Sequence, residues 1–178
     1  MNIVFHKTLI ALAIVAVPAL ASAATSTITF QGEVSEQTCQ ATMNGDTNSV
    51  LLMPTISSKE LASAGATAGL TPFTIQVSGC QVGGSAQNIG TKFLGRNVTP
   101  AGNLGNTGTA KNVAIQLTAT SGGDNPIALS GPTAVPGLVL NAGETSASYE
   151  FGAQYISEGG AAAAGSIQAV AEYSLSYL

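Results

Sequence analysis

The chain ends in the stretch GSIQAVAEYSLSYL, residues 165–178, in which apolar and polar side chains alternate. A period of two predicts a β-strand with one buried face. Soluble proteins usually protect such a strand edge with Lys, Pro or a bulge, whereas the only charge here is Glu172. We therefore expect that something covers this edge, or that the edge is waiting to be covered. Its apolar face consists of Ile167, Ala169, Ala171, Tyr173, Leu175 and Tyr177.

The same period recurs along the chain, and no long segment repeats apolar residues at helical spacing. Turn signals rich in Gly, Asn and Asp separate the alternating stretches. A short helical turn is expected at 57–64 and a long Gly-rich surface loop at 95–108. Many short strands with punctuated turns predict an all-β sandwich. Besides the last strand, the expected strands are 27–34, 49–53, 73–77, 92–94, 113–119, 135–140 and 149–155.

The first 23 residues predict a secretory signal peptide. An apolar run at 9–20 follows Lys7, and Ala21-Ser22-Ala23 offers small residues at the positions that a signal peptidase reads. The run is too short for a membrane span of about 20 residues. Cleavage before Ala24 removes 23 of the 178 residues and leaves 155, which fits one domain.

Composition excludes several classes of function. The mature chain keeps four basic residues against nine acidic ones, and its only histidine, His6, leaves with the signal peptide. A nucleic-acid site or a polybasic membrane site needs a basic stripe, which this chain lacks. Without histidine, a Ser-His-Asp triad and a His-ligated metal site are impossible. We predict no catalytic, cofactor-binding or metal-binding residues, and no enzyme activity.

The two cysteines, Cys39 and Cys80, are expected to form one disulfide, because an exported chain meets an oxidising compartment. Two unpaired buried thiols are the alternative. A cross-link between residues 41 positions apart contributes about 4 kcal/mol on the chain-entropy model.

Four short motifs and the end of the chain carry a family resemblance. FQGEV at 30–34 precedes Cys39, and FTIQVSGC at 73–80 ends in Cys80. FLG at 93–95 and FGAQY at 151–155 follow, then Gly165, fourteenth from the end, and the penultimate Tyr177. In this order, over essentially the whole mature chain, the sequence resembles chaperone–usher pilins of the type 1 fimbrial kind.

The resemblance implies an incomplete immunoglobulin-like β-sandwich that lacks its last strand. A groove then runs along residues 166–178; a periplasmic chaperone fills it first, and the N-terminal segment of a neighbouring subunit replaces the chaperone at the outer-membrane usher. The implied organisation is a signal peptide at 1–23, a donor-strand segment at 24–35 and a pilin domain at 36–178. The implied donor residues are Ile28, Phe30, Gly32 and Val34, and the acceptor groove consists of Gly165, Ile167, Ala169, Ala171, Tyr173, Leu175 and Tyr177.

The implied function is that of a structural subunit of a surface fimbria, which polymerises by donor-strand exchange and supports adhesion and biofilm formation. Its partners would be neighbouring copies, the chaperone and the usher, with a tip adhesin as a further candidate. The segment ahead of Ile28 is short and carries the polar Ser26, which keeps a minor adaptor or tip subunit as an alternative. A free periplasmic carbohydrate-binding sandwich is a more distant one.

Overall fold

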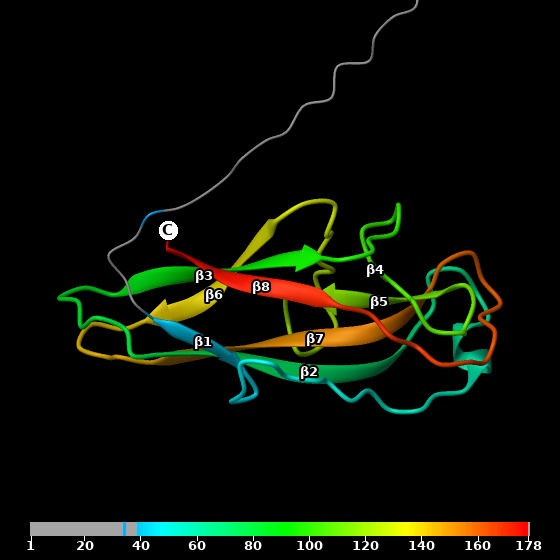
Figure 1. Ribbon diagram of the computed structural model, residues 1–178, viewed down its shortest axis with the longest axis horizontal. Coiled ribbons are helices and arrows are strands. Elements are labelled where there is room, and N and C mark those ends of the chain that lie inside the picture. Colours follow the sequence, from blue (N-terminus) through cyan, green and yellow to red (C-terminus); the bar gives the residue numbers. More distant parts are fainter. Residues whose placement is uncertain (1–33, 35–38, 178) are drawn as a thin grey trace, which may run out of the picture. The chain divides into compact units, whose positions relative to one another are not determined.

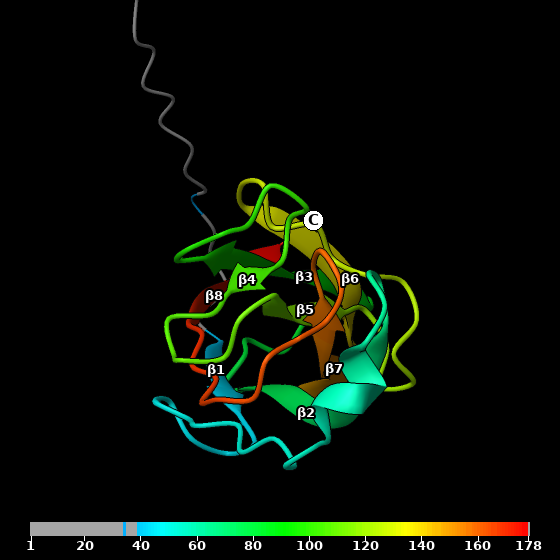
Figure 2. The ribbon, with the colours of Figure 1, turned by 90° about the vertical axis from the view of Figure 1, so that its right-hand side faces the viewer.

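The computed structural model describes Val34 and residues 39–177. Residues 39–177 form two antiparallel sheets packed face to face (Figures 1 and 2). One sheet has five strands in the order β1-β2-β7-β5-β4, and the other has three in the order β6-β3-β8. The predicted all-β sandwich is confirmed. The elements are β1 (Gln40–Met43), the 3-10 helix η1 (Ser58–Leu61), β2 (Thr67–Ser78), β3 (Gln87–Gly95), β4 (Leu104–Gly105), β5 (Val113–Thr118), β6 (Thr133–Leu140), β7 (Ala147–Ser157) and β8 (Ala171–Tyr177).

The core lies between the two sheets and is centred on aromatic rings. Phe73 of β2 and Phe151 of β7 stack at 5.6 Å between ring centroids, and Phe93 of β3 meets Phe151 edge-on at 5.1 Å from the opposite sheet. Tyr149 adds a second edge contact to Phe151 at 5.0 Å. Offset and edge-to-face pairs of this kind contribute about 0.5–1.5 kcal/mol beyond the area that they bury. The apolar residues that alternate with polar ones in the sequence therefore lie on the two sheet faces that pack together.

The last predicted strand begins only at Ala171, and two other predicted elements also differ from the sequence expectation. The helical turn expected at 57–64 is a single 3-10 turn, Ser58–Leu61, which starts at a capping box between Ser57 and Glu60. The strand predicted at 49–53 is wrong, because in the described chain this segment has no ladder partner. The segment nevertheless keeps its alternation, since Leu51 packs against the core while Leu52 is 84% exposed.

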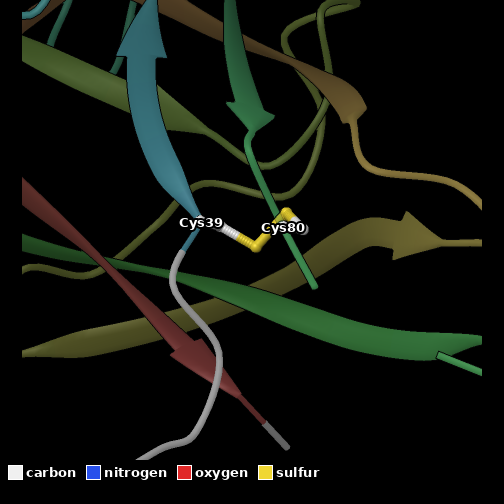
Figure 3. Close-up of a disulfide and its surroundings, with 2 residues drawn as sticks. All are labelled: Cys39 and Cys80. Atoms are coloured by element: carbon white, nitrogen blue, oxygen red, sulfur yellow. A yellow bond between two sulfur atoms is a disulfide. The ribbon is translucent and has the colours of Figure 1, made fainter. Parts of the chain in front are cut away.

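The disulfide joins the ends of two neighbouring strands. Cys39 precedes β1 and Cys80 follows β2, and the two strands pair antiparallel with Gln40 opposite Ser78 (Figure 3). The Cα atoms of the two cysteines are 4.1 Å apart, and the bond closes a 41-residue separation. The predicted disulfide is therefore confirmed. It ties the start of the described domain to β2.

Replacing both cysteines with serine should lower the free energy of unfolding by about 4 kcal/mol, because the unfolded chain regains the entropy that the cross-link removes. Urea unfolding followed by circular dichroism measures the change. Reduction of the unaltered protein with a thiol is the matched control and should give the same midpoint as the variant. An unchanged midpoint in both samples would mean that the bond adds no net stability.

Candidate functional site: an open core beside β8

β8 lies at the edge of the three-stranded sheet (Figure 1). It pairs with β3, from Ile89 opposite Tyr177 to Gly95 opposite Ala171. On β3, which has strands on both sides, the inner side chains of Ile89 and Phe93 are sealed at 1% and 3% exposure. The inner side chains along β8 and just before it contact the same core but are only half-buried: Ile167, Ala169, Ala171, Tyr173, Leu175 and Tyr177. The core is therefore open along this edge.

The chain before β8 continues the edge and is held from one side. The backbone carbonyls of Ser166, Gln168 and Val170 accept hydrogen bonds from the N–H groups of Ala110, Thr107 and Arg96 at 3.0, 2.9 and 3.1 Å. Successive residues of an extended chain point their backbone groups to opposite sides. The backbone groups of Ile167 and Ala169 therefore face the open side. Residues 165–177 are called the acceptor edge below.

A second segment forms the opposite side of the opening at one end. Residues 49–56, called the opposite wall, pack Leu51, Met53 and Ile56 against the core. The Tyr155 hydroxyl fixes this wall by donating a hydrogen bond to the Pro54 carbonyl oxygen at 3.1 Å. Burial raises the pKa of Tyr155, so the phenol keeps its proton and remains a donor at neutral pH.

The acceptor edge and the opposite wall enclose a pocket of about 360 Å³, called the end pocket. Its lining includes the aliphatic side chains of Met53, Ile56 and Leu61, which suit an aliphatic side chain. Residues 53–56, Ser58, Leu61, Ala110, Val113, Tyr155 and residues 162–167 line it. Gly165, the glycine that the resemblance singled out, therefore lies at this end of the opening.

Gly165 is required by a close approach of two backbones. A Cβ atom placed on it would lie 2.7 Å from the Cα atom of Ala110, closer than real Cβ contacts come. Gly108 has the reciprocal constraint, since its Cβ atom would lie 2.7 Å from the carbonyl carbon of Ser166. The sequence predicted a surface loop at Gly108. The repeated glycines of this loop are the only local signal that could have indicated a close backbone approach.

Gly165→Ala should lower the free energy of unfolding by about 2 kcal/mol, because the two backbones must separate to admit the methyl group. The hydrogen bonds between Ser166 and the 109–110 backbone would lengthen with that movement. Gly84→Ala is the matched control, since a Cβ atom there meets nothing within 4 Å. Urea midpoints compare the two variants. Equal midpoints would show that the crossing tolerates a side chain.

Three of the four predicted donor residues lie outside the part of the chain that the structure describes. Ile28, Phe30 and Gly32, like the signal peptide at 1–23, fall outside the described residues, and Val34 is fully exposed. Across residues 39–177, no group of three or more His, Cys, Asp or Glu side chains could hold a metal ion. The described part of the chain also contains no helix with the length and apolar character needed to cross a membrane.

The chain is similar to known fimbrial proteins. A family model described as fimbrial protein matches residues 28–178. The F17 fimbrial protein of Escherichia coli is 35% identical over 157 residues, which cover 84% of this chain and 86% of that protein. The major fimbrial subunit SMF-1 of Stenotrophomonas maltophilia is 36% identical over 121 residues, 65% of this chain and 69% of that one.

Two further similarities concern the subunit role and the fold. The minor fimbrial subunit HifD of Haemophilus influenzae is 31% identical over 182 residues, which cover 97% of this chain and 82% of that protein. The crystal structure of the P pilus rod subunit PapA shares the fold, with a TM-score of 0.59 at 17% identity over 78% of this chain and 99% of that one.

Proposed function

The chain belongs to the fimbrial protein family and is a structural subunit of a bacterial surface fimbria, and we propose that it polymerises by donor-strand exchange. The observation that carries the proposal is the core left open along the acceptor edge. Residues 24–34 of a second copy would lie along this edge and seal the core. Before assembly a periplasmic chaperone would occupy the same place, and the outer-membrane usher would exchange the two.

The donor strand should run antiparallel to β8. Every described strand pair of the sandwich is antiparallel, and an added antiparallel strand continues the sheet without a change of pattern. This direction places Val34 of the donor at the Gly165 end of the acceptor edge and Ala24 near Leu175. The eleven donor residues then match most of the thirteen residues of the acceptor edge in length.

Side-chain sizes favour one register in that direction. Directly opposed residues of an antiparallel pair point to the same face, so each inward donor residue meets an inward residue of the acceptor edge. With Val34 opposite Gly165, each large side chain meets a small one. The pairs are Val34 with Gly165, Gly32 with Ile167, Phe30 with Ala169, Ile28 with Ala171, Ser26 with Tyr173 and Ala24 with Leu175. Val34 would enter the end pocket, and Gly32, which has no side chain, would lie beside Ile167 at the edge of that pocket.

Tyr177→Ala should weaken capture of the subunit before assembly. The Tyr177 side chain packs against the core from the edge strand, and removal of a half-buried ring costs about 2 kcal/mol. Immunoblots of periplasmic extracts should show less of the variant than of the unaltered chain. Ser174→Ala is the control, since its side chain is exposed on the same strand. Wild-type levels of the Tyr177 variant would contradict this role.

Two subunit roles remain to be separated by experiment, because the chain is similar to both a major and a minor fimbrial subunit. We propose the main structural subunit first and a minor adaptor or tip subunit second. Antibody-labelled fibres viewed by electron microscopy should carry label along their whole length in the first case. Label confined to fibre ends or rare positions would favour the second case.

A structural subunit needs no catalytic centre, so we propose that the chain is not an enzyme. Its partners would be other copies, the chaperone, the usher and, at the fibre end, an adhesin. A free carbohydrate-binding sandwich would instead be a stable monomer without the chaperone. Size-exclusion chromatography of the chain produced alone distinguishes that outcome from aggregation or degradation.

A further inference from the structure

Two unpaired lysines stand beside the end pocket. Lys59 lies in η1 between the lining residues Ser58 and Leu61, and Lys111 follows the lining residue Ala110. The Lys111 carbonyl also accepts a hydrogen bond from the N–H of Ala163, another lining residue, at 3.0 Å. Both side chains are exposed, and neither has an ion-pair partner among the described residues.

The acidic groups at this end of the domain are already engaged. The Glu60 carboxylate accepts a hydrogen bond from the N–H of Ser57 at 2.9 Å. Glu158 accepts from Thr99 and Asn103 at 2.7 and 2.5 Å, and Glu172 pairs with Arg96. The donors to Glu60 and Glu158 are neutral, so these carboxylates keep their charge, but neither of them forms an ion pair with Lys59 or Lys111. A chain with only four mature basic residues places two of them here.

Acidic residues lie at the opposite end of the domain and just ahead of it in the sequence. Figure 1 shows η1 and the loops around residues 111 and 160 at one end, with the start of β1 and the end of β8 at the other. Glu144 lies at this second end, in the turn whose Thr145 carbonyl accepts from the Cys80 N–H at 3.1 Å. In sequence, Glu33 and Glu36 flank Val34 shortly before Cys39.

We propose that Lys59 and Lys111 form a docking site for Glu33 and Glu36 of the next copy, so that charge guides the entry of the donor strand. The inference rests on the proposed function, which brings Val34 to the end pocket. In the proposed register Glu33 would point away from the groove, and Glu36, two residues beyond Val34, would lie within about 7 Å of it along an extended chain. The next domain begins at Cys39, so its acidic end must face the lysine-bearing end of the first copy.

We expect the two lysines to change the rate of donor-strand uptake more than the affinity for the donor strand. Exposed ion pairs add little to an equilibrium, whereas complementary charge raises the association rate and makes it depend on salt. The Debye length shortens from about 30 Å at 0.01 M salt to about 3 Å at 1 M. Donor uptake should therefore be several-fold faster at low salt than at high salt, and the variant Lys59→Glu/Lys111→Glu, which places like charges opposite each other, should reverse this dependence.

The experiment follows uptake of a fluorescent peptide of residues 24–38 by the mature subunit purified with its chaperone. Lys59→Glu/Lys111→Glu should slow uptake about tenfold at low salt and little at high salt. A peptide with Glu33→Lys and Glu36→Lys should restore the rate with this variant and slow it with the unaltered subunit. Lys92→Glu, the same change of charge on β3 away from this end, should leave the rate unchanged.

The outcomes separate the two proposals. Uptake that proceeds at the same rate at all salt concentrations and in all charge variants overturns the docking role and leaves donor-strand exchange intact. Slower uptake that the exchanged peptide does not restore also overturns it, because the lysines would then act through folding or another partner. No uptake of the peptide by the unaltered subunit overturns the proposed function itself.

Discussion

Deleting residues 24–29 should stop fibre growth while leaving a subunit that is exported and folded. In the proposed register these six residues pair with residues 170–175, so the deletion removes Ile28 and uncovers most of β8. At about 1 kcal/mol for each backbone hydrogen bond, the lost half of the ladder weakens the joint by several kcal/mol. Each 1.4 kcal/mol is a factor of ten in the equilibrium constant. Electron microscopy of cells and immunoblots of periplasmic extracts measure the two effects.

The deleted subunit keeps its own acceptor edge, which gives the experiment an internal control. It should still receive the donor strand of an unaltered copy but offer none that binds firmly. Produced together with the unaltered chain, it should therefore shorten fibres. Ile28→Val is the matched substitution, since it keeps a branched apolar side chain and should assemble normally. Fibres of normal length from the deletion variant alone would contradict the donor role of this segment.

The alternation of apolar and polar residues predicted the buried strand faces reliably. Every second residue from Ile167 to Tyr177 contacts the core as the period of two predicts, because the faces of a strand alternate with local spacing. The same rule gave the wrong element at 49–53, where the apolar residues face the core but no neighbouring strand completes a ladder. Hydrogen-bond partners are distant in sequence, so a local pattern predicts which side chains are buried but not which backbones pair.

The sequence likewise predicted one part of the candidate site and not the other. The unprotected edge at the end of the chain was visible in the sequence, because charge and proline are local properties. The end pocket was not, because its lining comes from segments that are far apart in the sequence: residues 53–56 with Ser58 and Leu61, Ala110 with Val113, Tyr155 of β7, and residues 162–167. The contact of Gly108 with Ser166 depends in the same way on two segments that meet only in the folded chain.

Ala169→Phe should block entry of the unaltered donor, and Phe30→Ala in the donor should restore it. In the proposed register the two positions lie opposite each other, so two phenyl rings would compete for one space. Overpacking of this kind costs about 3 kcal/mol, roughly a hundredfold in affinity. Gln168→Phe adds the same side chain to the exposed face and should leave binding unchanged. Competition between labelled donor peptides, measured at equilibrium, gives the four affinities of a double-mutant cycle.

The same experiment at Ala171 tests the direction of the donor strand. Ala171→Phe should be restored by Ile28→Ala and not by Phe30→Ala, because Ile28 lies opposite Ala171 in the antiparallel register. A parallel donor with Ala24 beside Gly165 would instead bring Phe30 to Ala171 and Ile28 to Ala169. A shift of the antiparallel strand by two residues would also bring Phe30 to Ala171. Rescue of Ala171→Phe by Phe30→Ala would therefore reject the proposed register, whereas rescue of Ala169→Phe by the same donor change is unique to it among the three arrangements.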